Sequence, residues 1–364
     1  MFPGGVAIRD RLRTGMKLLR ATIAGVGPFE GLVLPFADEG GEARPVTVIH
    51  GGGGVGKTTV LHVISSTRPG HTVVQPPRAE PREAGPPHAI CEWMLGQDEP
   101  GRPHPLCVAS PNVRVSPSDE VESLRRREQA FFDRVAGDGG FAFLTIASTR
   151  WFSRQPIGFS APARSIARYD VRQAPGLDDA TRSDLARETK QALAYAAISE
   201  ALSAPNEAEP RRYDLLGAAM RAVVDQFVAL GGVRYRGLDP GSFEPIFEAR
   251  SKALAFDALP TRVRDLAALA ALSVRTLWAA YPERDPRDAE GVLAIDELEL
   301  HQDAQVQAEL LRTLREALPE AQWIVTTTSP LIAASADASA VLALRRLPSE
   351  ERVVVHSGEE ALTH

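Results

Sequence analysis

Short apolar runs alternate with amphipathic stretches along the 364-residue chain, and this alternation predicts its elements. Runs rich in β-branched residues and bounded by glycine or proline are typical of strands, whereas apolar residues at intervals of three and four are typical of helices. The predicted strands are Leu18–Val26, Leu32–Phe36, Pro45–His50, Ala89–Leu95, Pro105–Ala109, Phe141–Ala147, Gly291–Ile295 and Gln322–Thr326, with two closing strands near Val341 and Val353. The predicted helices are Val60–Ser65, Ser118–Ala136, Asp178–Leu202, Tyr213–Leu230, Thr261–Tyr281 and Gln302–Ala317. Strands that alternate with helices favour an α/β fold with a mainly parallel core sheet.

Two departures from this alternation divide the chain. Residues 69–117 hold eleven of the 28 prolines, and proline neither donates to a strand ladder nor continues a helix. Short strands there would form an antiparallel β subdomain, while the two Ala-rich helices after residue 176 predict a helical insertion. We therefore expect an N-terminal lobe over residues 1–175, a helical insertion over 176–232 and a C-terminal lobe over 233–364.

A glycine-rich segment lies between the strand Pro45–His50 and the helix that follows it. It matches the phosphate-binding loop pattern G-x-x-x-x-G-K-[ST] of P-loop NTPases, known as Walker A. The matching residues are Gly51, Gly52, Gly53, Gly54, Val55, Gly56, Lys57 and Thr58. Glycines let backbone N–H groups turn toward a phosphate, and the helix N-terminus adds the positive end of its dipole. We expect Lys57 to reach the β- and γ-phosphates, Thr58 to bind Mg²⁺ and Thr59 to contact the α-phosphate, so ATP and Mg²⁺ are the expected ligands.

A pair of adjacent carboxylates ends the apolar strand Gly291–Ile295. Asp296, at the strand end, is placed to hold Mg²⁺ through water, as a Walker B aspartate does. Glu297, one residue further on, is placed to act as the general base for the attacking water. Two acids after a strand are common by chance, so their meaning depends on the phosphate loop.

Three segments resemble ABC-type ATPases of the SMC/RecF/OLD group. Residues 21–29, with Gly27-Pro28-Phe29, look like the opening strand and "gpF" turn of that family. Residues 295–301 are similar to its "DE-x-E-x-H" Walker B and D-loop region, and residues 325–332 look like its "TTHSPLI" switch strand. The resemblance implies an ABC-ATPase-like head in which two protomers enclose ATP, each phosphate loop facing the partner's signature helix.

Two positions depart from the family pattern. Thr328 stands where the family has a switch histidine, and a threonine cannot be the same charged sensor of the γ-phosphate. The family's signature "LS-x-G-x-R" aligns best with residues 259–264, where only Leu259 and Arg264 agree. Thr261, Arg262 and Arg264 could still contact a partner's nucleotide, or could form a solvated helix start. Slow or partner-dependent hydrolysis is therefore expected.

The loop after the strand Phe141–Ala147 carries two weaker signals. By its place after that strand, Gln155 resembles the family's Q-loop glutamine, although no motif fixes it. Residues Arg150–Arg172 contain five arginines interleaved with aromatics, a composition typical of a nucleic-acid groove. The alternative, which we favour for a chain of net charge −6, is that these arginines pair with acids elsewhere in the fold.

Composition narrows the class of protein. The content of 44% hydrophobic and 24% charged residues is that of a globular chain. Two cysteines are too few for a disulfide framework. No run approaches the roughly 18 apolar residues of a membrane span, and the charged N-terminus is unlike a secretory signal. A cytoplasmic location is the expectation.

The leading hypothesis is an ATP-hydrolysing switch that dimerises on ATP and acts on a partner, of the kind used in DNA repair or phage defence. The partner could be DNA or an effector protein, and the dimer could be of like or unlike chains. One alternative is a binding module that closes on ATP without hydrolysing it. A less favoured one is a ParA/MinD-type partition ATPase, because the extra loop lysine of that family would fall on Gly52.

Overall fold

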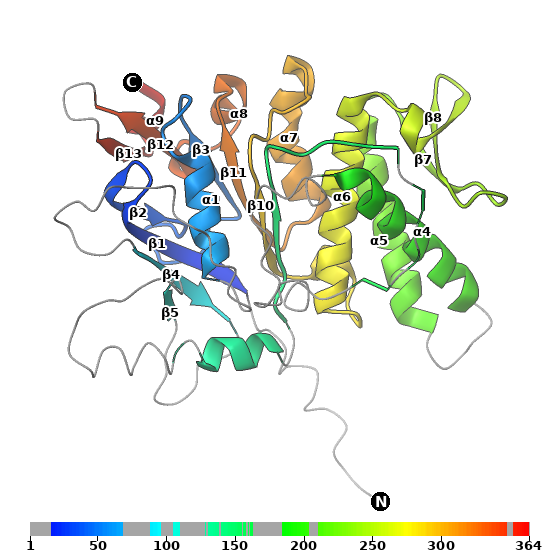
Figure 1. The fold of residues 1–364 in the computed structure, drawn as a ribbon, viewed down its shortest axis with the longest axis horizontal. Coiled ribbons are helices and arrows are strands. Elements are labelled where there is room, and N and C mark those ends of the chain that lie inside the picture. The colour runs from blue at the N-terminus through cyan, green and yellow to red at the C-terminus, as the bar shows by residue number, and fades with distance from the viewer. Residues whose placement is uncertain are drawn as a thin grey trace, which may run out of the picture.

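The computed structural model describes residues 16–67, 88–95, 105–109, 128, 130–137, 140–154, 156–157, 159, 161–162, 184–203, 210–347 and 352–363. They form an α/β molecule in which a central sheet separates a β-rich side from a helical side (Figure 1). The fold class predicted from the alternation of strands and helices is thereby confirmed. Within the described ranges, no helix is long and apolar enough to cross a membrane.

The central sheet has six strands in the order β13-β12-β3-β11-β10-β6. Their bounds are β3 Val46–His50, β6 Phe143–Ile146, β10 Gly291–Ile295, β11 Ala321–Thr327, β12 Val341–Arg346 and β13 Val353–Ser357. All neighbours pair in parallel except β12 and β13, which are antiparallel. Because the parallel strands run the same way, the carboxyl ends of β3, β11 and β10 meet at one edge, where ligands of open α/β sheets bind.

Residues of the central strands alternate between two apolar cores. Val48 of β3 and Leu293 of β10 belong to the core on the helical side, whereas Ile49 and Val292 belong to the core on the β-rich side. Every residue of β10 and β11 is buried. Strands covered on both faces read as continuous apolar runs, which is why the pattern of the sequence identified them.

The β-rich side is a four-stranded antiparallel sheet in the order β2-β1-β4-β5. Its strands are β1 Lys17–Val26, β2 Phe29–Pro35, β4 His88–Met94 and β5 Leu106–Ala109. β1 pairs with β2 and β4 pairs with β5, both antiparallel, so the predicted antiparallel β subdomain is confirmed. One side chain joins this sheet to the central one, because the buried amide of Gln322 accepts from the N–H of Leu18 at 2.7 Å and donates to its carbonyl at 2.8 Å.

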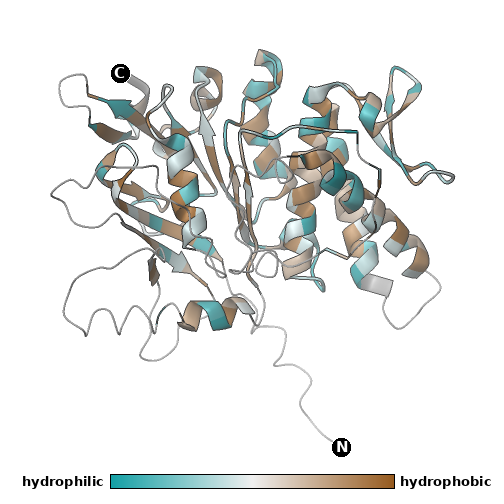
Figure 2. Ribbon diagram, in the orientation of Figure 1, coloured by the Kyte–Doolittle hydropathy of each residue, from teal (hydrophilic) through white to brown (hydrophobic). Residues whose placement is uncertain are grey.

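Helices cover the other face of the central sheet. They are α4 Leu185–Ser203, α5 Pro210–Ala229, α6 Thr261–Ala280 and α7 Ala304–Ala317. In Figure 2, brown apolar residues run through α4, α5 and α6, which pack together in the core of the helical side. On the β-rich side lies α1 Lys57–Ser66, and two further short helices are α8 Pro330–Ala334 and α9 Glu359–Thr363.

A second antiparallel sheet was not foreseen from the sequence. It contains β7 Arg234–Leu238, β8 Pro245–Ala249 and β9 Lys252–Ala255 and lies between α5 and α6 in the chain. Residues 128 and 130–137 are helical, in agreement with the end of the helix predicted over Ser118–Ala136. The starts of that helix and of the one predicted from Asp178 lie outside the described residues.

Candidate functional site

The glycine-rich segment forms a tight turn between β3 and α1. Gly54 and Gly56 have φ angles of 75° and 93°, which L side chains rarely adopt. A Cβ atom at Gly56 would lie 2.6 Å from the ring of Phe29 and 2.7 Å from Pro28, so the β1–β2 turn packs directly on the loop. Gly52, Gly53 and Gly54 are exposed, and Gly56, the N-cap of α1, has no side chain to accept from the first-turn N–H groups. Exposed loop amides and uncapped helix donors suit an anion such as a triphosphate.

Lys57 points back along the loop. Its Nζ donates to the carbonyls of Gly51 at 2.8 Å and Gly52 at 2.9 Å. Burial lowers the pKa of the Lys57 ammonium from its ordinary value, while Glu299, Glu297 and Asp296 act in the opposite direction. The ammonium is thus held beside the loop, and neither of these two hydrogen-bond partners is a carboxylate. If phosphate oxygens replaced the two carbonyls, their negative charge would offset the free-energy cost of burying the ammonium.

Thr58 and Asp296 meet although 238 positions separate them in the sequence. The Thr58 hydroxyl donates to Asp296 Oδ2 at 2.8 Å, and Thr326 Oγ1 donates to the other carboxylate oxygen at 2.5 Å. Asp296 is almost fully buried at the end of β10. A hydroxyl and a carboxylate oxygen at one point, next to a phosphate loop, fit a Mg²⁺ that keeps several waters and takes few protein ligands. Within the described ranges, no cluster of three or more His, Cys, Asp or Glu side chains offers a fuller metal site.

Glu297 follows Asp296 in an unusual backbone conformation. Its φ of 48° lies in the left-handed region, which is costly for a residue with a side chain. Its N–H donates to Thr326 Oγ1 at 2.8 Å, so one threonine hydroxyl contacts both members of the acid pair. The side chain is partly exposed at the edge of the sheet that carries the phosphate loop.

The segment after β11 is fixed by a carboxylate that sequence reasoning did not single out. Glu299 Oε1 accepts from the N–H and the hydroxyl of Thr328, both at 2.6 Å, and Oε2 accepts from the Thr327 hydroxyl at 2.7 Å. Burial raises the pKa of Glu299, but these hydrogen bonds outweigh burial and hold the pKa below its ordinary value. Glu299 is the second glutamate of the "DE-x-E" pattern. Its place in that pattern was the sequence feature from which a role for this residue could have been predicted.

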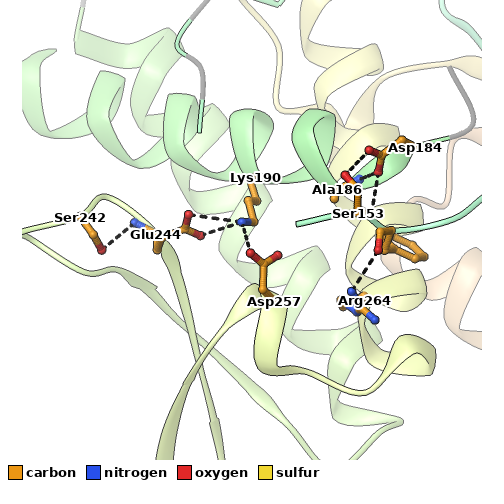
Figure 3. A network of polar contacts seen from close by, with 9 residues as sticks. Ser153, Asp184, Ala186, Lys190, Ser242, Glu244, Asp257 and Arg264 are labelled. Atoms are coloured by element: carbon orange, nitrogen blue, oxygen red, sulfur yellow. Dashed lines mark hydrogen bonds and ion pairs between the residues drawn. The ribbon is translucent and has the colours of Figure 1, made fainter. Parts of the chain in front are cut away.

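The signature-like residues lie at the first turn of α6. Thr261 and Arg262 are exposed, and Arg262 pairs with Asp303, the N-cap of α7, at 2.5 Å. Arg264 lies over the ring of Phe152, and its guanidinium donates to the Phe152 carbonyl at 3.4 Å (Figure 3). Of the two possibilities for these residues, contact with a partner's nucleotide or a solvated helix start, the solvated start describes Thr261 and Arg262 in the single chain. Arg264 is instead held against the neighbouring loop.

At Arg150, the arginine-rich loop does not form the nucleic-acid groove that its composition suggested. Arg150 is 3% exposed, and its Nε donates to Asp265 of α6 at 2.7 Å, so its inclusion in a surface groove was wrong. The favoured alternative, pairing with an acid elsewhere, holds for this residue. Arg154 is exposed. The remaining arginines of the loop, Arg164, Arg168 and Arg172, lie outside the described residues, as does Gln155.

Comparison with known proteins gives a short sequence match and distant structural ones. No family model matches the chain. A stretch of 73 residues is 40% identical to the Septu protein PtuA of Bacillus thuringiensis and spans 17% of this chain and 18% of that protein. The SMC head domain from Thermotoga maritima superposes with a TM-score of 0.44 at 14% identity, over 94% of this chain and 99% of that one. An Smc head domain from Pyrococcus furiosus, bound to the C-terminal domain of ScpA, gives 0.47 at 15% identity, over 95% and 98%.

Proposed function

We propose that the chain is a P-loop ATPase that binds and hydrolyses ATP and uses the nucleotide to switch its association with a second protomer. The observation that carries the proposal is the meeting of Thr58 and Asp296 beside Lys57. Loop, lysine, hydroxyl and acid pair gather at the carboxyl ends of β3 and β10, where a nucleoside triphosphate would have every group that P-loop chemistry needs.

Each residue has a role that follows from its position. The exposed loop amides and the first turn of α1 would bind the phosphates, and Lys57 would exchange the carbonyls of Gly51 and Gly52 for phosphate oxygens. Thr58 and Asp296 would hold Mg²⁺, which when bound neutralises charge on the phosphates. Glu297 would accept the proton of the attacking water. Thr328 would face the γ-phosphate from the neighbouring strand, in the place of the family's histidine.

A partner-directed role completes the proposal. In the family that the sequence resembles, two heads enclose ATP and act on DNA or on an effector, and the first turn of α6 is exposed as that arrangement requires. The short match to the Septu protein PtuA favours the phage-defence branch over DNA repair. The match spans under a fifth of that protein.

Two substitutions test nucleotide binding and hydrolysis separately. Lys57→Ala removes the only side-chain cation of the loop and should weaken ATP binding by at least tenfold in a calorimetric titration with ATP and Mg²⁺. Glu297→Gln keeps the shape of the acid but cannot accept the proton, so ATP binding should be retained while phosphate release falls by about a hundredfold or more. Arg312→Ala, which removes an exposed ion pair on α7, serves as the control and should change neither property.

The outcomes also separate the alternatives. ATP affinity unchanged in Lys57→Ala would overturn the assigned loop. Binding without phosphate release by the wild-type protein, with or without a copurifying partner, would instead favour the module that closes on ATP and does not hydrolyse it. Phosphate release that persists in Glu297→Gln would remove Glu297 from its role and leave the loop assignment intact.

A further inference from the structure

Arg150 connects two parts of the molecule that the proposed reaction needs together. Its guanidinium, with the side chain 1% exposed, donates from Nη1 to the Asp296 carbonyl at 2.6 Å and from Nη2 to the Glu297 carbonyl at 2.9 Å. Its Nε donates to Asp265 Oδ1 at 2.7 Å. One planar group therefore contacts the backbone of both acids and the first turns of α6 at once.

Asp265 extends this contact toward the start of α6. Its side chain is fully buried, and its second oxygen accepts from Gln302 Nε2 at 3.1 Å. The same Gln302 nitrogen donates to the carbonyl of Arg262 at 3.2 Å, within the exposed first turn of α6. The chain of buried polar contacts thus runs from the exposed end of α6 through Asp265 and Arg150 to the peptide of Glu297.

We propose that Arg150 is a positioning residue for hydrolysis, which ties the backbone of Glu297 to the first turn of α6 through Asp265. This inference rests on the proposed ATPase function. It adds to that function a structural connection between the signature-like residues at the first turn of α6 and the general base Glu297. A shift of α6, such as a second protomer binding its first turn would cause, moves Asp265 and with it the guanidinium that holds the Glu297 carbonyl.

The backbone of Glu297 needs such a tie. A φ of 48° is unfavourable for a glutamate and persists only where the surroundings determine it. Three contacts do so here. The Glu297 N–H donates to Thr326 Oγ1, and its carbonyl accepts from Arg150 and from the N–H of Leu300 at 3.0 Å. Lysine cannot replace this arginine, because its ammonium is a compact point charge and cannot span two carbonyls and a carboxylate in one plane.

The segment that carries Arg150 is itself anchored. Ser153, three residues on, donates from its N–H to Asp184 at 3.0 Å, and the Phe152 carbonyl accepts from Arg264 of α6 (Figure 3). These hydrogen bonds fix the backbone near Arg150. Movement of α6 would therefore displace the acid pair and would not be absorbed by a change in the conformation of the loop.

The test compares two buried arginines that each form an ion pair involving α6, Arg150 with the α6 residue Asp265 and the α6 residue Arg275 with Glu188 of α4. Arg150→Lys should lower kcat for ATP hydrolysis by about tenfold or more, with the dissociation constant for ATP and Mg²⁺ changed by less than twofold. Arg275→Lys is the matched control, since Arg275 is a similarly buried residue of α6 that pairs with Glu188 at 2.9 Å. It lies about 15 Å further along the helix than Asp265, at about 1.5 Å per residue, and should leave kcat unchanged.

A double-mutant cycle then examines the tie itself. Asp265→Asn should lower kcat to a similar extent, and the double variant Arg150→Lys/Asp265→Asn should be little worse than either single variant. Losses that simply multiply, or an equal loss of kcat in Arg275→Lys at comparable thermal stability, would overturn the proposal.

A second measurement does not depend on turnover. Amide hydrogen exchange should become faster in Arg150→Lys, both in the peptide containing residues 296–300 and in the first turn of α6, while Arg275→Lys leaves both at the wild-type rate. Unchanged exchange at residues 296–300 would overturn the positioning role even in a protein that hydrolyses ATP. Absence of hydrolysis in the wild type would count against the proposed function alone, because the exchange result would still decide whether Arg150 ties the two segments.

Discussion

At the scale of single residues, the carboxylate of Glu299 makes a prediction about pH. Its pKa lies below the ordinary value because the hydrogen bonds from Thr327 and Thr328 outweigh burial. A depressed carboxylate pKa adds stability above the unfolded pKa of about 4.3 and loses it as the pH falls through the folded value. Glu299→Gln should therefore lower the free energy of unfolding by about 1–2 kcal/mol at pH 7, and the difference should shrink below about pH 4.

Urea unfolding of the two proteins at pH 7 and at pH 3.5 provides the measurement. Glu316→Gln is the control, because Glu316 pairs with Arg312 on the exposed face of α7 and such pairs contribute little. A loss for Glu299→Gln that stays constant between the two pH values would mean that the ionised form of Glu299 is not what stabilises the segment.

Single residues also show where reading the sequence succeeded and where it could not. The loop residues Gly51–Thr58 form a local pattern, so the sequence was enough to predict their turn. The partner of Thr58 came from an apolar strand that ends in acids, and the structure brings Asp296 to it. Arg150 could not be placed in this way, because its environment is set by Asp265, 115 positions away, and nothing in the neighbouring residues marks it as buried.

At the scale of elements, the contact between the phosphate loop and the β1–β2 turn predicts that two glycines of the loop, Gly56 and Gly53, tolerate substitution differently. At Gly56 a Cβ would be 2.6 Å from Phe29 and the φ is 93°, whereas at Gly53 nothing lies within 4 Å of a Cβ. Gly56→Ala should therefore lower the free energy of unfolding by about 2 kcal/mol or more, since it combines a left-handed backbone with overpacking. Gly53→Ala should leave stability within about 0.5 kcal/mol of the wild type.

Thermal and urea unfolding of the two variants, without nucleotide, would check this difference. Equal free energies of unfolding would show that the β1–β2 turn can move away from the added Cβ without loss of stability, and that this turn does not fix the conformation of the loop. ATP titration of Gly53→Ala adds a further readout, because an intact fold with weakened binding would separate the role of that exposed glycine in approaching phosphate from any role in folding.

Elements differ in how well they could be predicted, for a physical reason. The strands β3, β10 and β11 are buried on both faces and appear in the sequence as apolar runs. The small sheet of β7, β8 and β9 is largely exposed, with β7 and β9 showing no buried residue, so hydrophobic pattern carries no sign of it. Its one local signal was the turn segment Asp239-Pro240-Gly241-Ser242, which is rich in turn-forming residues.

At the scale of the whole molecule, the phosphate loop and the first turn of α6 open on the same edge of the central sheet (Figure 1). The Arg150 contacts place the start of α6 next to the end of β10, while α1 begins at the end of β3, with β11 between the two strands. A single chain thus presents the phosphate loop and the first turn of α6 at one edge of the sheet. In the proposed dimer, related by a twofold axis, the α6 of each protomer would cover the nucleotide of the other.

This arrangement predicts how a single charge should affect dimerisation. Glu297→Gln in the presence of ATP and Mg²⁺ should form a dimer detected by light scattering after size exclusion, because slow hydrolysis leaves the nucleotide in place. Adding Thr261→Glu should weaken that dimer by at least tenfold. A carboxylate at the exposed first position of α6 would face the partner's triphosphate and repel it, although an acid at a helix N-terminus favours the helix itself.

Thr261→Gln is the matched control, since it has the size of glutamate without the charge and should dimerise more strongly than Thr261→Glu. ATP binding to the isolated protomer should be the same in the two variants, because β11 separates the strand that leads into the loop from the strand next to the start of α6. Equal dimerisation of the glutamate and glutamine variants would contradict the facing of α6 and triphosphate. A protein that stays monomeric with ATP in every variant would limit the proposal to an ATPase that acts as a single head or with an unlike partner.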